Sequence, residues 1–358
     1  MDKLWKKNWE ETKIHFNSWW NHTGMVLVLQ GKIKKLAPPH ENIPDPGPAG
    51  SLEQRYLDPE WIANYWRHRL SKDNFLADHL PIAGTDMGVG SLGLYLGAEP
   101  GFEETTVWFK PCLADAESRQ KLAFDPEQKW WKQHEKIIRE SVKRSNGNYF
   151  VGCPNLVENI DILSALRDPQ GLMMDMLESP EWVKEKIDEI NQAYFEVYDR
   201  IYDLIKLEDG SATFGALELW GAGKTAKLQC DASAMISPDM FNELLAPALT
   251  EQCRFLDYSM YHLDGTQAIC HLDRLLAIPE LDAIQWTPQA GMPKPGDKCW
   301  YELYKRILNG GKSLQVNGAD KDTVVPLLDE IGTEGVYLFV DKVDTEKDAE
   351  WLMEKYYK

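Results

Sequence analysis

The chain has 358 residues, with 39 Lys plus Arg against 57 Asp plus Glu and a formal net charge of -18. Hydrophobic residues make up 43% of it and charged residues 27%, a composition that excludes a largely disordered chain. The acidity, with no basic stretch to balance it, argues against a surface for nucleic acid or anionic membrane and leaves a small neutral or cationic substrate open.

Neither the start of the chain nor its cysteines indicate export. The first apolar run, Met25 to Leu29, is too short to span a bilayer, and the charged, Trp-rich stretch before it is unlike a signal peptide. The 6 cysteines are scattered without a CxxC pair, which is typical of a reducing compartment. We therefore expect a cytoplasmic protein with no membrane segment.

Short β-rich runs alternate with helical periodicity along the chain, the pattern that gives a parallel sheet with crossover helices. Proline follows a helix-capping residue at Asp58, Ser179 and Ser237, which predicts that a helix begins at each place. The predicted strands are Met25 to Leu29, Leu80 to Thr85, Tyr149 to Cys153, Ala212 to Leu219, Ser259 to Leu263, Ala283 to Trp286, Ser313 to Val316 and Val336 to Val340.

This alternation predicts an α/β fold, a (β/α)8 TIM barrel over residues 25–358, preceded by an N-terminal helical extension over 1–24. A doubly wound open sheet is disfavoured because no glycine-rich first turn follows the first strand. The Pro- and Gly-rich segment 36–50 follows that strand, where a barrel carries active-site loops, so we expect it to form a lid or wall of the site.

Catalytic groups in such barrels lie at the C-terminal ends of the strands. Many carboxylates in such places only cap the next helix, as we expect of Asp320. Glu218 and His262 are harder to explain that way, because they lie in or at the end of apolar runs. The strand ends present Gln30, Asp86, Asn155, Glu218, Trp220, His262, Asp264, Trp286, Gln289, Asn317, Asp320 and Asp341.

His262 and Asp264 are two residues apart in a predicted strand, so their side chains point to the same face. They could ligate a divalent metal, with Asp341 or Glu218 as a third ligand, act as a metal-free acid and base, or form a structural pair. Trp220 and Trp286 are candidates for stacking on a planar or sugar ligand, beside Gln289 and Asn317 as polar substrate contacts.

Six further segments carry a family resemblance. They are Pro81 to Gly97, Leu172 to Val183, Cys230 to Leu249, Tyr261 to Gly265, Asp282 to Trp286 and Leu314 to Gly318. In this order they resemble the uroporphyrinogen decarboxylase superfamily, which contains the haem-pathway decarboxylase and the cobalamin-linked methyltransferases. The resemblance covers most of the chain beyond about residue 80 and implies a (β/α)8 barrel and an aspartate after the second strand, here Asp86.

This chain departs from the superfamily pattern at three places. The decarboxylase carries an arginine-containing loop after strand one, where this chain reads Gln30 to Lys35 with no arginine, so true uroporphyrinogen decarboxylation is disfavoured. The methyltransferase branch holds zinc through His-x-Cys-Gly and a later cysteine. Here the same places read His262-Leu263-Asp264-Gly265 and Asp341, which implies a site with oxygen ligands, suited to Zn or Mn.

The resemblance implies a methyltransferase-type enzyme closer to the cobalamin-linked branch, acting on a small molecule, with Asp86 and Glu218 handling protons or orienting substrate. It also implies a corrinoid held only by a partner protein, and a homodimer. Two other hypotheses stay open at this point: a metal-free carbohydrate-active enzyme that uses Glu218, Asp264 and Asp341, and a binding protein without catalysis.

Overall fold

The computed structural model describes residues 3–116 and 120–357. Its strands are β1 (Met25–Leu29), β2 (Ile82–Ala83), β3 (Glu99–Phe102), β4 (Val107–Lys110), β5 (Phe150–Val151), β6 (Ala212–Phe214), β7 (Leu219–Gly221), β8 (Thr225–Gln229), β9 (Tyr258–Asp264), β10 (Ala283–Thr287), β11 (Ser313–Ala319) and β12 (Val336–Val340).

The α-helices are α1 (Trp9–Trp20), α2 (Leu52–Leu57), α3 (Pro59–Ser71), α4 (Leu92–Tyr95), α5 (Lys129–Ser145), α6 (Asn159–Arg167), α7 (Pro169–Glu178), α8 (Pro180–Ile205), α9 (Pro238–Met240), α10 (Ala246–Phe255), α11 (Leu272–Leu276), α12 (Tyr301–Asn309), α13 (Val324–Ile331) and α14 (Glu346–Tyr356). None of the helices in the described part of the chain is long and apolar enough to cross a membrane.

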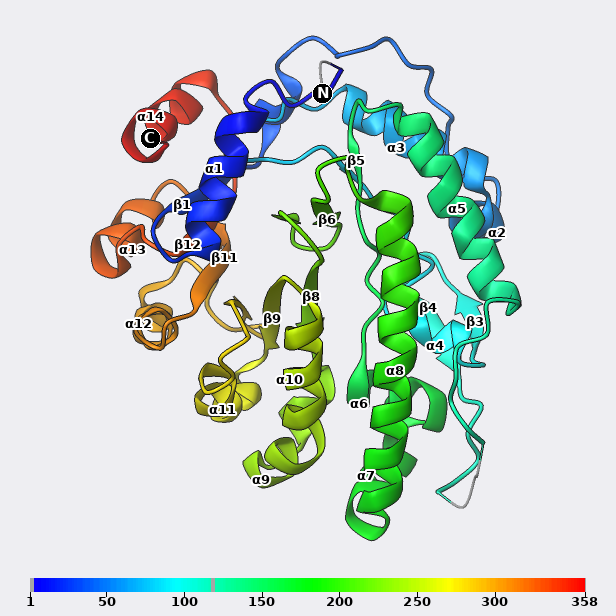
Figure 1. Cartoon of the computed structure of the whole chain (residues 1–358). Coiled ribbons are helices and arrows are strands. Elements are labelled where there is room, and N and C mark those ends of the chain that lie inside the picture. The colour runs from blue at the N-terminus through cyan, green and yellow to red at the C-terminus, as the bar shows by residue number, and fades with distance from the viewer. Residues whose placement is uncertain (1–2, 117–119, 358) are drawn as a thin grey trace.

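The fold is α/β and its main sheets are parallel, as the alternating pattern predicts. Six strands form one sheet in the order β1-β12-β11-β10-β9-β8, and β2 pairs with β5 in a second parallel sheet. The longer helices surround these strands in a ring (Figure 1). Between the described residues no parallel ladder joins β1 to β2 or β5 to β8, so the arrangement is compatible with a barrel but its hydrogen-bonded closure is not seen.

The strands differ from the sequence-based expectation around residues 212–229. The run Ala212 to Leu219, expected as one parallel strand, forms the antiparallel hairpin β6–β7. The strand that pairs in parallel with β9 is β8, which was not predicted. Its sequence, Thr-Ala-Lys-Leu-Gln, lacks the β-branched and aromatic enrichment by which the other strands were found, although every residue in it is buried.

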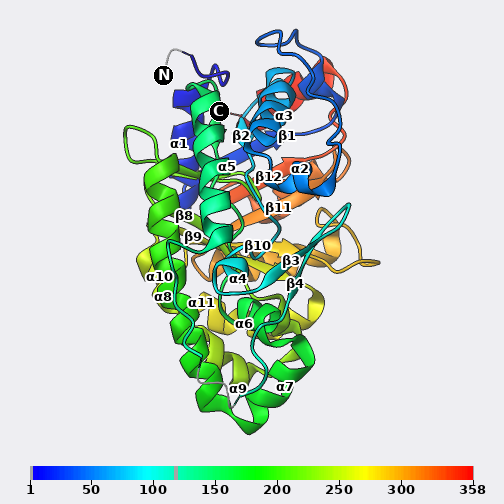
Figure 2. The same cartoon turned by 90° about the vertical axis from the view of Figure 1, so that its right-hand side faces the viewer.

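Helix α1 lies across the end of the sheet at which β11 begins. The indole Nε1 of Trp19 donates to the carbonyl of Leu314 (3.3 Å), and that of Trp20 donates to the carbonyl of Trp220 (2.9 Å). Viewed from the side, α1 is at one end of the strands, and α2 and the β3–β4 hairpin are at the other (Figure 2). The second end, where the parallel strands finish, is therefore the open one.

Local capping sets the helices that border this open end. The hydroxyl of Ser51 accepts from the amide of Gln54 (3.1 Å) and begins α2. The carboxylate of Asp58 accepts from the amide of Glu60 (2.9 Å), and Pro59 occupies the first turn of α3, as the Asp-Pro pair predicts. The six cysteines are free thiols, in agreement with their scattered spacing.

Candidate functional site

A row of polar side chains crosses five neighbouring strands in register. Gln229 of β8 pairs with His262 of β9, which pairs with Gln285 of β10, and the row continues through Gln315 of β11 to Tyr337 of β12. Residues in register on parallel strands point to the same side of a sheet. Trp286, one residue beyond Gln285, packs on Trp300 on the opposite side, so the polar row faces the interior.

Three potential metal ligands meet at the end of this row: the ligand atoms of Asp231, His262 and Asp264 all lie within 4.8 Å of one another. The structure thus brings His262 and Asp264 together, as their spacing predicts. The third ligand is Asp231, and not Asp341 as expected from the sequence. The reason is topological, since β8 is hydrogen-bonded to β9, whereas β12, which precedes Asp341, is separated from β9 by two strands.

The neighbouring carboxamide of Gln285 determines which nitrogen of His262 is free. The amide nitrogen of Gln285 donates to the carbonyl of Trp286 (2.7 Å) and to the hydroxyl of Thr287 (2.9 Å). Its amide oxygen therefore faces Nδ1 of His262 and accepts a hydrogen bond from it. With the proton on Nδ1, the Nε2 lone pair is available to a metal or to an acidic proton.

The protonation states of the three potential ligands favour metal binding near neutral pH. Burial and the nearby charge of Lys227 lower the pKa of His262, which keeps the imidazole neutral. Burial and the charges of Asp161 and Asp264 raise the pKa of Asp231 to about 6. The carboxylates of Asp231 and Asp264 repel each other, and a cation between them would relieve that repulsion.

A further set of hydrogen bonds fixes the backbone that carries Asp231. The carboxylate of Asp161 accepts from the amides of Asp231 (2.7 Å) and Ala232 (3.0 Å). The carboxamide of Gln229 donates to the Asp231 carboxylate (3.0 Å), and the amide of Gln229 donates to Glu158 (2.6 Å). Asp231 is therefore held in place by neighbours on α6 and β8.

Lys227 of β8 is 4% exposed and lies two residues before Gln229, whose side-chain oxygen accepts a hydrogen bond from it. Burial lowers the pKa of Lys227, while the charges of Glu158, Asp231, Asp161 and Asp86 oppose that effect. Burial also raises the pKa of Glu158. Lys227 thus supplies a positive charge among several carboxylates.

Asp86 follows β2 and lines a large cavity. Its carboxylate accepts from the amide of Asn155 (2.6 Å), and it is close enough to Lys227 for that charge to lower its pKa. The side chain of Asp86 is exposed to the cavity. The protein packed around the rest of the carboxyl group removes part of its hydration, and this effect raises the pKa of Asp86 overall. The resemblance-based expectation of an aspartate at the open end agrees with this position.

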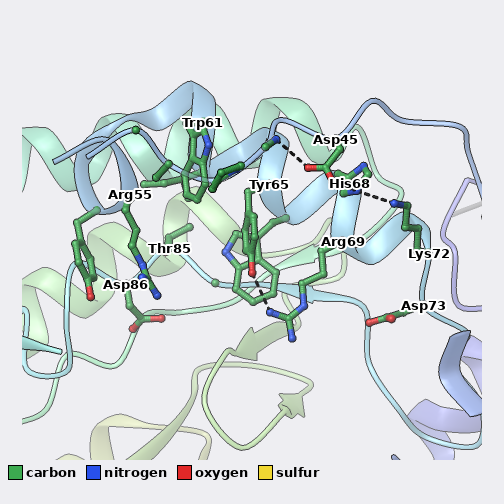
Figure 3. Close-up of a pocket in the computed structure, with 18 of the residues that line it drawn as sticks. Asp45, Arg55, Trp61, Tyr65, His68, Arg69, Lys72, Asp73, Thr85 and Asp86 are labelled. Carbon is green, nitrogen blue, oxygen red and sulfur yellow. Dashed lines mark hydrogen bonds and ion pairs between the residues drawn. The ribbon is translucent and has the colours of Figure 1, made fainter. Parts of the chain in front are cut away.

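The cavity beside Asp86 has a volume of about 1370 Å³ and is bordered by α2, α3 and the segment 36–50 (Figure 3). Ala37, Pro39 and 47–50 line it, so the Pro- and Gly-rich segment forms a wall of the cavity, as expected.

Glu218 and Trp220 lie away from the open end, contrary to the expectation for catalytic and stacking residues. Glu218 lies in the turn of the β6–β7 hairpin, where its carboxylate contacts Nδ1 of His79 (2.9 Å). Trp220 is 2% exposed and packs edge-on against Trp9 and Phe16 of the N-terminal helix. Because the run 212–219 folds back as a hairpin, its last residues do not reach the mouth.

The remaining predicted substrate contacts are distributed differently. Trp286 is fully buried against Trp300, so it offers no face to a ligand. The side-chain oxygen of Gln289 accepts from the amide (2.9 Å) and hydroxyl (2.6 Å) of Thr266, which joins the loops after β9 and β10. Asn317 lies two residues beyond Gln315 on β11, and its buried Oδ1 has no partner in the described chain, so it remains a candidate for substrate contact.

Asp231, Lys227, Glu158 and Asp161 were not identified as site residues from the sequence. Asp231 follows a strand by two residues, which is the same signal that identified other candidates, but strand β8 had not been recognised. Lys227 stands between Ala226 and Leu228, and a lysine enclosed by apolar neighbours in a buried strand is the signal that could have identified it.

Comparison with known proteins gives a fold but no family. No protein family model and no curated protein sequence matches the chain. Among solved structures, one described as a methyltransferase from Methanosarcina mazei is similar, with a TM-score of 0.61 and 11% sequence identity over 97% of this chain and 99% of that one. At this identity the similarity establishes a shared fold alone.

Proposed function

We propose that this protein is a methyltransferase-type enzyme that holds one divalent cation between Asp231, His262 and Asp264. The observation that carries the proposal is that Asp231, His262 and Asp264 each place one ligand atom within 4.8 Å of the others. Gln285 accepts from Nδ1 of His262, which leaves the Nε2 lone pair of the neutral ring for a ligand. The shared fold with a methyltransferase and the resemblance noted in the sequence support the reaction class.

The donor set suits zinc or manganese. Two carboxylates and one neutral imidazole are ligands that both ions accept. Two atoms bound about 2.1 Å from one ion lie at most about 4.2 Å apart, so small side-chain movements would bring the three residues onto a single ion. A bound ion would supply Lewis acidity, polarising an oxygen or thiol of the substrate.

The chain's own residues would orient the substrate and handle its protons. Gln285 fixes the imidazole ring of His262, and Asp161 fixes the loop that carries Asp231. Burial raises the pKa of Asp86, and only one of its carboxylate oxygens accepts from Asn155, so the other oxygen could hold or release a proton of the substrate. The charge of Lys227 would stabilise negative charge that develops near these carboxylates.

The methyl donor and the corrinoid-carrying partner protein are proposed from the sequence resemblance. By resemblance, the methyl group is exchanged between a small methylated compound and a corrinoid bound to a partner protein. The carbohydrate-active alternative loses its support, because Glu218, Trp220 and Trp286 are packed away from the open end. True uroporphyrinogen decarboxylation stays disfavoured, because residues 30–35 carry no arginine.

Metal analysis of protein purified without chelator tests the site. We expect about one ion per chain in the native protein and less than about a tenth of that in His262→Ala and Asp231→Asn, since each loses a ligand. Asp341→Asn is the matched control, and its metal content should equal that of the native protein. Metal loading should fall as the pH is lowered through about 6, where Asp231 takes up a proton.

The same measurement can contradict the proposal in two ways. Metal near zero in both native protein and His262→Ala would remove the metal from the proposal. Loss of metal in Asp341→Asn, with Asp231→Asn unaffected, would restore the ligand set expected from the sequence in place of the one assembled by β8 and β9.

A further inference from the structure

The cavity beside Asp86 is larger than a one-carbon substrate requires. Its volume of about 1370 Å³ exceeds the range of about 300–1,000 Å³ that is common for pockets binding drug-sized molecules. The segment 36–50, α2, α3 and the end of β2 all border it, so parts of the chain that are separate in sequence combine to form it (Figure 3). Such a space fits a sizeable organic molecule.

The cavity is locally cationic in an acidic protein. Its lining includes five lysines and arginines against four carboxylates, whereas the chain as a whole carries a net charge of -18. Two of the carboxylates are already engaged, since Asp45 contacts His68 (3.4 Å) and Asp86 accepts from Asn155 (2.6 Å). The positive charge in this cavity is therefore only partly compensated.

None of the five cations has a carboxylate partner among the residues that the structure describes, and two of the five are arginines. They are Arg55 of α2 and Arg69 of α3, which both line the cavity. Arg67, on the same helix as Arg69 but outside the lining, pairs with Glu41 (2.9 Å). A guanidinium carries five N–H donors, and most of those on Arg55 and Arg69 are free for an anion.

Aromatic rings hold these arginines and form an apolar surface beside them. The guanidinium of Arg69 lies 5.2 Å from the ring centroid of Trp66 and donates to the hydroxyl of Tyr65 (3.2 Å). Trp61 and Tyr65 stack at 5.2 Å with an interplanar angle of 17°. Aromatic rings of this kind accept a flat apolar group by stacking.

Two buried polar atoms of the lining residues also lack a partner in the described chain. Thr85 is 1% exposed, and its hydroxyl has no hydrogen-bond partner there. The indole Nε1 of Trp61 is also buried and also lacks a hydrogen-bond partner among the described residues. Buried polar groups in folded proteins nearly always find a partner. Because water does not reach either atom, a ligand in the cavity would supply these bonds only after a small rotation of the two side chains.

We propose that this cavity binds an organic anion with a flat apolar body. Arg55 and Arg69 would grip a carboxylate or phosphate, and the body would lie against Trp61 and Tyr65 with its other end toward Asp86. The placement of the far end of the ligand beside Asp86 rests on the proposed function, whereas binding of the anion to the cavity does not. Residues 30–35, directly after the first strand, carry no arginine, whereas Arg55 and Arg69 lie further along the same connection between β1 and β2.

Isothermal titration of the purified full-length protein with naphthyl phosphate, naphthoate and neutral naphthol tests the proposal. We expect both anions to bind more tightly than naphthol. The double variant Arg55→Gln/Arg69→Gln should weaken the anions about tenfold or more and leave naphthol within about twofold. Arg67→Gln is the matched control and should bind all three like the native protein. Preference for the phosphate or the carboxylate probe identifies the anionic group.

Equal affinity for naphthol and the anions, or an equal loss in Arg67→Gln, would overturn the proposal, as would the absence of anion binding to the native protein. Thermal melting of each variant checks that it is folded. Metal content of the double variant separates this proposal from the proposed function, because neither arginine belongs to the three-ligand group. Native-like metal with no anion binding overturns the cavity alone, and anion binding without metal overturns the metal site alone.

Discussion

A single amide decides how His262 can act. Gln285 uses both hydrogens of its amide nitrogen on Trp286 and Thr287, so its oxygen is left to accept from Nδ1 of His262. Residues that orient a metal-binding histidine in this way affect metal affinity although they do not touch the ion.

We therefore expect Gln285→Leu to lower metal affinity by about 10- to 100-fold, measured by competition with a chelator of known affinity. Gln315→Leu is the matched control. It removes the same side chain from the next strand, where the amide donates to Leu217 (2.9 Å), and it should retain native affinity. An equal loss in both variants would show that the interior as a whole, and not the orientation of His262, controls binding.

The sequence predicts two of the three ligands, His262 and Asp264, and not Asp231. The two-residue spacing of His262 and Asp264 predicts that they share a face, because side chains alternate along a strand. The third ligand depends on which strand lies beside β9, and that is a long-range property of the sheet order. Asp231 could therefore be found only once β8 was placed.

Among the elements, the β6–β7 hairpin differs most from expectation. Leu217 and Glu218, in its turn, both have positive φ angles, 64° and 51°, which are costly for residues other than glycine. The turn is held by hydrogen bonds from Gln315 to the carbonyl of Leu217 (2.9 Å) and from Tyr337 to the carbonyl of Glu218 (2.8 Å). The polar row in the interior thus fixes the hairpin.

This position assigns Glu218 a structural role. Its carboxylate accepts from the backbone amide of Leu80 (3.4 Å) and contacts the nearly buried His79 (2.9 Å). Glu218→Ala should lower the free energy of unfolding by about 1–3 kcal/mol, because it leaves these groups without a partner, while metal content stays native. Urea denaturation measures the first quantity and metal analysis the second.

The exposed Glu196 of α8 provides a control, since Glu196→Ala should change neither quantity. A Glu218→Ala protein with native stability but without metal or activity would return Glu218 to the catalytic group in which the sequence placed it.

Elsewhere the pattern of elements could be predicted well. The apolar runs at β1 and β12 have the predicted bounds, and the helices that begin at Asp58-Pro59 and Ser179-Pro180 form α3 and α8. These segments combine strong local signals with full burial on one face. The hairpins β3–β4 and β6–β7 depend on packing against distant parts of the chain, which local patterns do not contain.

At the scale of the molecule, the two ends of the chain meet at Asp78. His15 of α1 contacts its carboxylate (3.0 Å), the amide of Leu27 at β1 donates to it (2.9 Å), and the hydroxyl of Tyr357 donates to it from beyond α14 (3.3 Å). The carboxylate is fully buried. One group thus joins the first helix, the first strand and the C-terminal segment.

The contact with Asp78 makes part of the stability depend on pH. Burial lowers the pKa of His15, but the hydrogen bond and charge of Asp78 outweigh it, and the pKa is raised above 6.5. A raised histidine pKa stabilises the fold below the unfolded-state value, and this contribution is lost as the pH rises through the folded-state value. His15→Gln should therefore cost about 1–2 kcal/mol at pH 6 and less at pH 9.

Urea denaturation at the two pH values measures this difference. Ile14→Gln, on the exposed side of α1, serves as the control and should show the same small effect at both. A cost for His15→Gln that is independent of pH would mean that the imidazole contributes by packing and not by its charge.

The separation of the cavity from the three-ligand group has a consequence for how such a protein can diverge. The ligands come from β9 and the turn after β8, whereas the cavity wall comes from α2, α3 and the segment 36–50, early in the chain. Substitutions or insertions in residues 36–73 can alter which molecule is accepted without moving the group that would activate it. Descendants of one ancestor could thus exchange substrates while inheriting the same chemistry, and their similarity would persist in fold after it had faded from sequence.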